Sequence, residues 1–517
     1  MKNATSKYGI IRQEKWLVLL LALLIFMSCI STLNYDCNWG DDFAAYLNQG
    51  IAIAEGRFEQ QVALNAYMHP TTLPEECRNS DLVYSWGYSL IEAAVYKLVG
   101  FDRVNYESII YYKLISFVAI AIFSSILYLF FRRRFGKACS FFLCFILCIH
   151  PYLKDLASSL YSDIVFLLFS WLCFFFAESM TFKGKSLRSI VANSILFGVC
   201  MWATNSIRLN GFTVIIVAAL LHLKSVVSER KQFKPLHIIF HLIPYFIFAF
   251  LTIIFNYLIF APATPNLSDL KRISVFVLLS NIKTYIGLIA TFLLNLVGLD
   301  TGNYEYNPVF WIMLLMLIYG LFRAWKREFI LIAFTFCTFL TLIFLPYTQG
   351  MRYFINTFPI FMLLFGYSIG GLKEFIQNRF NPDIFIRLSG WTEGAAFMLS
   401  VVLFFSCWSN NFFHILQGND VRGYEYKTAY SSAAVEAYRY IQENTPEDCI
   451  IAYSKPRALY LNTERVSFNY DSNGHSLNEA DYFFCRSQDT ALPLEVWESG
   501  MLQLVWTNNE FSLFSVN

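Results

Sequence analysis

The stretch from Trp16 to Phe58 decides the fold class of this 517-residue chain: WLVLLLALLIFMSCISTLNYDCNWGDDFAAYLNQGIAIAEGRF. Its first part, Trp16–Leu33, is long and apolar, and a helix needs about 20 apolar residues to cross the hydrocarbon core of a bilayer. Two adjacent carboxylates, Asp41 and Asp42, follow shortly afterwards, and then come apolar residues at helical spacing. This order predicts a membrane span, an acidic pair at the membrane surface, and an amphipathic helix lying on that surface.

The composition extends this interpretation to the whole chain. Hydrophobic residues make up 56% of it, and only 15% of the residues are charged, against about 25% in soluble proteins. The chain is therefore predicted to be an α-helical polytopic membrane protein. Its net charge of +2 and its lack of a long basic tract give no reason to expect a nucleic-acid partner.

The apolar segments predict about eleven spans, several of them short by the twenty-residue standard. The first is taken as a retained helix and not a cleaved signal peptide, because it is long and no small-x-small site follows it. The interval Val275–Val297 is interpreted as a surface or re-entrant helix, because Asn281 and Lys283 interrupt it. The predicted spans are Trp16–Leu33, Ser108–Phe131, Lys137–Leu153, Ile164–Met180, Ser189–Asn205, Gly211–Leu223, Leu236–Phe260, Pro308–Arg323, Phe329–Tyr347, Tyr353–Leu372 and Ala395–Trp408.

Lysine and arginine clusters fall in alternate loops, and short loops rich in these residues face the cytoplasm. This pattern predicts a cytoplasmic N-terminus. It places the first long loop, residues 34–107, on the outside together with the tail that follows Trp408. The predicted organisation is a transmembrane domain at 1–408, whose first outer loop carries amphipathic surface helices, and an extracytoplasmic domain at 420–517.

The tail has the pattern of a small soluble α/β domain. A helix is expected to end at Pro446, a strand to cover Cys449–Tyr453, and a second helix and strand to follow. DYFFC, LQLVWT and FSLFSV predict further strands, with a turn at Asn508–Asn509 between the last two. About 100 residues are enough to form a core.

Three acidic residues are candidates for catalysis. Asp41 and Asp42 precede a predicted helix, where one aspartate is a common N-cap, but two adjacent ones are less easily explained in that way. A carboxylate at the membrane boundary can accept a proton from the hydroxyl of a second substrate. Asp163 begins a later apolar run, so it caps that helix or reaches the same outer cavity as Asp41.

Three basic residues are candidate phosphate contacts. Arg208 lies where two short spans meet on the outside, and Arg352 begins a span, where a cation is not favoured by the helix dipole. Both guanidinium groups are able to hold a phosphate with two hydrogen bonds, while snorkelling to lipid head groups is the alternative role. Lys154 is a weaker candidate for the same contact.

Four of the twelve cysteines are predicted to lie outside, where disulfides can form. Cys37–Cys77 and Cys449–Cys485 are two candidate pairs that sequence alone does not settle. A divalent metal is possible at the acidic residues but is not indicated, because no histidine or cysteine joins them. Proton transfer to a carboxylate and charge stabilisation by arginines require no cofactor.

Several motifs, in their order, resemble those of GT-C glycosyltransferases of the protein O-mannosyltransferase and lipid A aminoarabinose transferase kind. The motifs are GDDFAAYLNQGIAIAEG, YSWGYSLIEAAVYKLVG, HPYLKDLASSLYSD, IRLNG and RYFINTFPIF. The tail, AYRYIQENTPEDCIIAYSKPRALYLNTERVSF, is similar to the outer C-terminal domain of bacterial members. SDLVYSWG lacks the lysine and the adjacent prolines that aminoarabinose transferases carry at this point, which leaves the identity of the donor open.

The resemblance implies a GT-C fold and an inverting transfer of a sugar from a polyprenyl-phosphate donor on the non-cytoplasmic face. The acceptor would be a hydroxyl of a lipid, a glycan or a protein, and the enzyme would lie among the lipids of the bacterial inner (plasma) membrane. It implies that Asp41 is the catalytic acid, Asp42 its partner and Asp163 the second acid. Arg208 and Arg352 would contact the lipid phosphate.

Two other functions remain open. A polytopic transporter or flippase of lipids or glycans also has many spans and intramembrane charge, but the chain shows no repeated halves and its acids lie at the surface. A polymerase or ligase of surface glycans shares the topology but not the early acidic pair.

Overall fold

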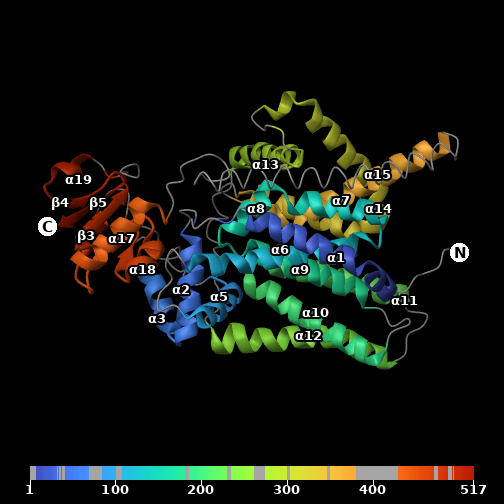
Figure 1. Cartoon of the computed structure of the whole chain (residues 1–517), viewed down its shortest axis with the longest axis horizontal. Helices are drawn as coiled ribbons and strands as arrows, with labels where there is room; N and C mark the ends of the chain where they lie inside the picture. Colours follow the sequence, from blue (N-terminus) through green and yellow to red (C-terminus); the bar gives the residue numbers. More distant parts are fainter. Residues whose placement is uncertain are drawn as a thin grey trace.

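A computed structural model of the chain describes residues 7–31, 33, 37, 41–68, 84–100, 108–180, 186–229, 235–260, 274–297, 299, 303–345, 350–379, 429–470, 475–486, 492 and 494–517. Figure 1 shows a long helical bundle with a small strand-containing region at one end. Three further helices, α2 (Asp42–Glu55), α3 (Phe58–Tyr67) and α5 (Trp86–Val99), lie between these two parts (Figure 1).

The bundle is built from long apolar helices. They are α1 (Lys7–Ile30), α6 (Ile109–Phe131), α7 (Lys137–Cys148), α8 (Pro151–Ser158), α9 (Asp163–Ser179), α10 (Leu187–Ile207), α11 (Gly211–Glu229), α12 (Pro235–Ile253) with a π-helix (Ile254–Ile259), α13 (Val275–Asn295), α14 (Pro308–Ile343) and α15 (Phe358–Arg379). Short 3₁₀ turns at Tyr304–Tyr306 and Met351–Thr357 precede α14 and α15. The predicted polytopic helical class is confirmed.

The count of about eleven spans is not confirmed. Within the described residues, seven helices are long and apolar enough to cross a membrane, or eight if the pair α7 and α8 forms one span. The predicted span Lys137–Leu153 is that pair, and the two helices are bent by 54° to each other at the break before Pro151. The predicted span Ala395–Trp408 lies outside the described residues.

Two further span predictions need correction. Helix α13 passes the test of length and composition, so one lysine and one asparagine do not remove it from the candidate spans. The two spans predicted on either side of residues 324–328 belong to one 36-residue helix, α14, and the predicted break is present as a kink at Glu328. An unbroken helix of that length would extend about 54 Å, well beyond the roughly 30 Å of the bilayer core, so a break is physically expected.

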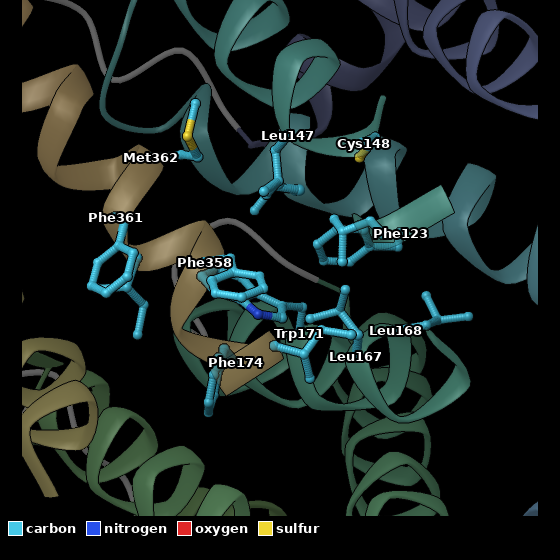
Figure 2. Close-up of a cluster of buried hydrophobic side chains, with 14 of the residues drawn as sticks. Phe123, Leu147, Cys148, Leu167, Leu168, Trp171, Phe174, Phe358, Phe361 and Met362 are labelled. Atoms are coloured by element: carbon cyan, nitrogen blue, oxygen red, sulfur yellow. The ribbon is translucent and has the colours of Figure 1, made fainter. Parts of the chain in front are cut away.

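The bundle core is aromatic, and it fixes the helix ends that carry the site. Trp171 of α9 is fully buried and packs edge-on against Phe130 and Phe174, with ring centroids 5.1 and 5.5 Å away. Phe358, the first residue of α15, stacks on Phe292 of α13 at 4.1 Å. Figure 2 shows Trp171 and Phe358 within one cluster of buried side chains. Aromatic pairs of this kind contribute about 0.5–1.5 kcal/mol beyond their buried area.

Buried ion pairs join the helices at the end of the bundle away from the strand-containing region. Arg134 follows α6 and pairs with Glu178 of α9 and, at 2.7 Å, with Glu328 at the kink of α14. The Tyr367 hydroxyl of α15 also donates to Glu328 at 2.7 Å. The kink in α14 is therefore anchored to three other helices.

Helix α2 confirms the predicted helix after the acidic pair but is more buried than a helix on a free surface. Gly50 lets it approach α5 closely, because a Cβ at this position would lie 3.1 Å from the Cβ of Glu92. The other face of α2 packs against α18 of the C-terminal region. Gly56, with a φ of +73°, ends the helix in the left-handed conformation that glycine favours.

The C-terminal region is a mixed α/β unit, as predicted. Its elements are α17 (Ser432–Asn444), β1 (Ile450–Ala452), α18 (Pro456–Thr463), β2 (Val466–Phe468), a 3₁₀ turn (His475–Glu479), β3 (Tyr482–Arg486), α19 (Leu494–Glu498), β4 (Leu502–Thr507) and β5 (Phe511–Val516). The strand order is β2-β1-β3-β5-β4, with β1 parallel to β2 and β3 and the other pairs antiparallel. The expected boundaries at residues 408 and 420 lie outside the described residues.

One of the two candidate disulfides is not formed. Cys449 is a free, buried thiol, so Cys449–Cys485 is not a disulfide. The two residues lie on or beside different strands, and the packing of the sheet does not bring their sulfur atoms together. Cys77 lies outside the described residues, which leaves Cys37–Cys77 as a prediction.

Candidate active site

Four charged residues form a chain of alternating sign at the end of the bundle that faces the C-terminal region. Arg352 Nη1 donates to Asp42 Oδ2 at 2.9 Å, and Arg352 Nε lies 3.5 Å from Asp163 Oδ2. Arg208 Nη1 donates to the other oxygen of Asp163. We call Asp42, Arg352, Asp163 and Arg208 the ion-pair cluster. The structure thus brings together four of the six residues that the sequence indicated.

The cluster forms because each member occupies a helix end. Asp163 is the first residue of α9, where the positive end of the helix dipole favours a carboxylate, and Arg208 follows the last residue of α10, where a cation is favoured. Arg352 is the second residue of the 3₁₀ turn Met351–Thr357, a position that gives a cation no such advantage. The two carboxylate partners of Arg352, Asp42 and Asp163, explain why an arginine stands at this position.

Aromatic rings surround the two arginines. The Arg352 guanidinium lies 4.7 Å from the ring centroid of Tyr161 and 5.8 Å from that of Tyr353. The Arg208 guanidinium lies 5.3 Å from the same Tyr353 ring. Such contacts contribute about 0.5–2 kcal/mol each and hold the planar groups in fixed orientations. The cluster is therefore preorganised.

The Asp41 side chain contacts different residues from those that Asp42 contacts. Its Oδ1 accepts the backbone N–H of Ala458, in the first turn of α18, at 3.0 Å, and its Oδ2 lies 4.0 Å from Arg457 Nε. Asp41 therefore acts as an anion at the N-terminus of a helix in the C-terminal region, a favourable arrangement for a carboxylate. The side chain has one oxygen held by α18 and the other beside a guanidinium.

Tyr84 joins the two aspartates. Its hydroxyl donates to Asp42 Oδ1 at 2.8 Å and accepts from Arg457 Nη1 at 3.2 Å, and the Arg457 guanidinium also lies 5.0 Å from the Tyr84 ring. Gln49 of α2 fixes the Tyr84 backbone with two hydrogen bonds, to its N–H at 2.9 Å and its carbonyl at 3.2 Å. Polar contacts therefore run from Asp41 through Arg457 and Tyr84 into the ion-pair cluster.

Arg457 and Tyr84 were not singled out by the sequence. Tyr84 belongs to a quoted motif, but nothing in that motif distinguishes it from the other tyrosines. Arg457 is separated from Asp41 by more than 400 positions, and only the docking of α18 on α2 brings them together. No spacing rule connects them.

The two aspartates have opposite pKa shifts. Burial raises the pKa of Asp41 above its usual value of 3.8, although Arg457 and the Ala458 N–H act against the shift. Burial acts in the same direction on Asp42, but the charge and hydrogen bond of Arg352 and the hydrogen bond of Tyr84 outweigh it, so the pKa of Asp42 is lowered. Asp42 is held ionised, while Asp41 binds a proton more readily.

Lys154 stands apart from the contacts described so far. It is buried on α8, and its ammonium group interacts electrostatically with the thiol of Cys29 on α1. Among the described residues, no group of three or more histidine, cysteine, aspartate or glutamate side chains is arranged to hold a metal ion. The carboxylates of the cluster instead face guanidinium groups.

The fold has counterparts among solved structures. No family model matches the sequence, and no curated protein sequence is significantly similar to it. The crystal structure of ArnT from Cupriavidus metallidurans bound to undecaprenyl phosphate superposes with a TM-score of 0.57 and 12% identity, over 97% of this chain and 98% of that one. The archaeal oligosaccharyltransferase AglB from Archaeoglobus fulgidus, in complex with an inhibitory peptide and a dolichol-phosphate, superposes with a TM-score of 0.53 and 12% identity. The match covers 94% of this chain and 70% of that one.

These similarities extend over nearly the whole chain, including the C-terminal region. At such low identity they establish the architecture and not the substrate. The shared architecture confirms the fold class predicted from the sequence, a polytopic helical protein with a small C-terminal α/β part. The chain is a polytopic helical membrane protein that shares the fold of ArnT and AglB.

Proposed function

We propose that the protein is an inverting glycosyltransferase that moves a sugar from a polyprenyl-phosphate donor to a hydroxyl of a lipid, a glycan or a protein. The observation that carries this proposal is the placement of the ion-pair cluster and Asp41 at one end of a GT-C fold. Two guanidinium groups suited to a phosphate lie there beside a carboxylate suited to accept a proton. ArnT and AglB, which share the fold, bind undecaprenyl phosphate and dolichol-phosphate.

In the proposed reaction, Asp41 Oδ2 takes the proton of the acceptor hydroxyl as its oxygen attacks the anomeric carbon of the donor. The bond between that carbon and the phosphate oxygen breaks in the same step, so the configuration inverts and the polyprenyl phosphate leaves with the electron pair. Because Oδ1 is held by the Ala458 N–H, Oδ2 keeps a fixed direction. A phosphate monoester is a good leaving group, so protonation of its oxygen is not required.

The arginines stabilise the negative charge that grows on the departing phosphate. Each guanidinium has five N–H donors, and Arg352 uses only one in a hydrogen bond within the described residues. Arg352 Nε and Asp163 Oδ2 are both buried and lie 3.5 Å apart as an ion pair, but neither atom makes a hydrogen bond within the described part of the chain. Buried polar atoms of this kind are candidates for ligand contacts, with Nε suited to a phosphate oxygen and Oδ2 to a sugar hydroxyl.

The test of this function is mass spectrometry of the envelope glycolipids, glycans and glycoproteins of the source cells with and without the gene. We expect one product to lose the mass of a single sugar in the deletion strain. The wild-type gene should restore this mass, whereas a gene encoding Asp41→Asn should not. Transfer restored by that variant, or an unchanged set of products in the deletion strain, would refute the proposal. A transporter would instead cause an unmodified substrate to accumulate on the other side of the membrane.

The proposed reaction also requires that the site lies on the non-cytoplasmic face of a membrane, here the inner membrane of a bacterium. The exposed residues Glu443, in the C-terminal region, and Lys326, beside the kink of α14, are on opposite sides in this arrangement. In a Cys337→Ser background, which removes an exposed thiol, Glu443→Cys should react with a membrane-impermeant maleimide in spheroplasts. Lys326→Cys should react only after permeabilisation. The reverse pattern would overturn the topology.

A further inference from the structure

A cavity of about 410 Å³ lies between α2, α3 and the C-terminal region, beside the C-terminal half of α2. Helix α2 contributes Asn48 and Glu55 to its wall, the α2–α3 connection contributes Arg57, and α3 contributes Gln60. The C-terminal region closes it with residues of α18 and β2. We call this space the seam cavity. Its volume falls within the range of about 300–1,000 Å³ that holds small ligands.

The wall of the seam cavity has the chemistry of a saccharide site. Glu55 accepts hydrogen bonds from Tyr96 Oη at 3.0 Å and Arg57 Nε at 2.9 Å, and Arg57 also interacts with the Tyr460 hydroxyl. These contacts fix the directions of several donors and acceptors around the cavity. Planar carboxylate, amide and guanidinium groups in fixed orientations suit the hydroxyl rim of a sugar.

The remaining lining is apolar. Ile51 of α2, Leu64 of α3 and Leu461 of α18 face the same space, alongside the rings of Tyr96 and Tyr460. A pyranose has two C–H faces and a polar edge, so a cavity with apolar patches between fixed polar groups matches it. Two carboxylates, Glu55 and Glu464, against one guanidinium give the lining a negative excess, which disfavours phosphates and sulfates. A neutral or amino sugar is favoured.

The backbone at the rim supports a functional interpretation. Glu464 ends α18 with a φ of +59° and a ψ of +13°, in the left-handed region. Glycine or asparagine is the usual residue at such a position, and other side chains are strained there. The backbone of Glu464 is therefore strained, and its side chain places a carboxylate at the mouth of the cavity. Strain of this kind gathers where it serves binding or catalysis.

The seam cavity is linked to Asp41 through α2 and α18. Asn48 lies seven residues after Asp41, which is two turns, so the two side chains share one face of α2 about 10 Å apart along its axis. Asn48 Nδ2 donates to the backbone carbonyl of Arg457 at 3.1 Å, and the side chain of Arg457 lies beside Asp41. The phosphate-binding arginines are bonded to Asp42 and Asp163 instead. The acceptor side of the proposed reaction is therefore the side of α18.

We propose that the seam cavity binds the acceptor of the proposed transfer reaction, and that this acceptor is a glycan with neutral or amino sugars. The inference rests on the proposed function. A sugar in the cavity is held by Glu55, Gln60 and Glu464, and Glu55 lies about four helical turns along α2 from Asp41. Another part of the glycan presents the reacting hydroxyl to Asp41. Both domains are needed to form the site.

The test is saturation-transfer NMR and calorimetry on the full-length protein in detergent, with chitosan hexaose as the probe. We expect the sugar protons of the probe to receive saturation from the protein. Glu464→Gly should weaken binding about tenfold or more, the loss expected for one charge-assisted hydrogen bond. The same change should leave the melting temperature unchanged or raise it, because glycine relieves the left-handed strain. Glu443→Gln, an exposed carboxylate of the neighbouring α17, is the matched control and should bind the probe normally.

Equal binding by wild type and Glu464→Gly, or no binding of chitosan hexaose, would overturn the inference. Spermine, a polycation without pyranose rings, tests whether charge alone explains the binding. Spermine binding as tight as that of the hexaose would also overturn the inference. The proposed function fails separately: specific hexaose binding with no loss of envelope glycosylation in the deletion strain would leave a saccharide site in a protein that is not this transferase.

Discussion

Asp41→Asn is expected to lower the turnover of sugar transfer by about 10²–10⁴-fold, the contribution typical of a general base. Asparagine keeps the shape of the side chain and an oxygen that accepts the Ala458 N–H, so α18 should stay docked on α2. It cannot take the proton of an acceptor hydroxyl. The measurement is the initial rate of transfer with the purified protein, using the donor and acceptor identified from the envelope products.

Binding of polyprenyl phosphate should change little in this variant, because the phosphate contacts belong to the arginines of the ion-pair cluster. Asp448→Asn, which alters an exposed carboxylate of the C-terminal region, serves as the matched control and should transfer at the wild-type rate. An Asp41→Asn protein with more than one-tenth of wild-type turnover would remove Asp41 from the role of base.

The pH profile provides a second readout for Asp41. Only the ionised carboxylate accepts a proton, so transfer should fall as the pH drops through the pKa of Asp41. Burial raises this pKa above 3.8, so the acid limb should lie at higher pH than that of a free aspartate. If Asp42 were the base instead, the acid limb would lie below pH 3.8, because Arg352 and Tyr84 lower the pKa of Asp42. The position of the limb therefore distinguishes the two aspartates.

Arg352→Lys is expected to lower turnover by about 10²–10³-fold, the usual loss when one group that stabilises transition-state charge is removed. Lysine keeps the positive charge but not the planar fork that reaches Asp42 and Asp163 from different nitrogens. It also loses the contact with the Tyr161 ring that orients the guanidinium. Initial rates, and the dissociation constant of a polyprenyl phosphate in nanodiscs, measure the effect.

Arg439→Lys, at an exposed position on α17, is the matched control and should change neither quantity. A melting temperature close to that of wild type would show that Arg352→Lys is folded, as expected while Arg208 still pairs with Asp163. If the folded variant binds polyprenyl phosphate and transfers sugar as well as wild type, Arg352 does not contact the leaving group.

Much of the fold was predictable because local rules govern it. The last two strands begin and end as the patterns LQLVWT and FSLFSV predicted, since alternation of apolar residues and a turn at Asn508–Asn509 need no distant partner. The helix after the acidic pair also formed as predicted, ending at Gly56. The number of spans does not follow from local rules in the same way, because breaks such as the kink at Glu328 depend on buried ion pairs with other helices.

The candidate site was predictable only in part, and for a related reason. Asp163, Arg208 and Arg352 each lie at the end of an apolar segment that the charge pattern assigns to the same side, and ends of neighbouring spans on one side of a membrane are close in space. That reasoning leads to the ion-pair cluster without any knowledge of the packing. It gave no indication of Arg457, which is brought to the site by a domain folded some 400 residues later.

The sequence alone determined the membrane class, the α/β tail and the charged residues that gather at one end of the bundle, because apolar length, alternation and charge act over a few turns or strands. The tertiary structure decided which aspartate pairs with Arg352, which one caps α18, and where a cavity opens between the domains. These choices depend on how α18 docks on α2, and that docking depends on contacts between residues more than 400 positions apart, which no local pattern encodes.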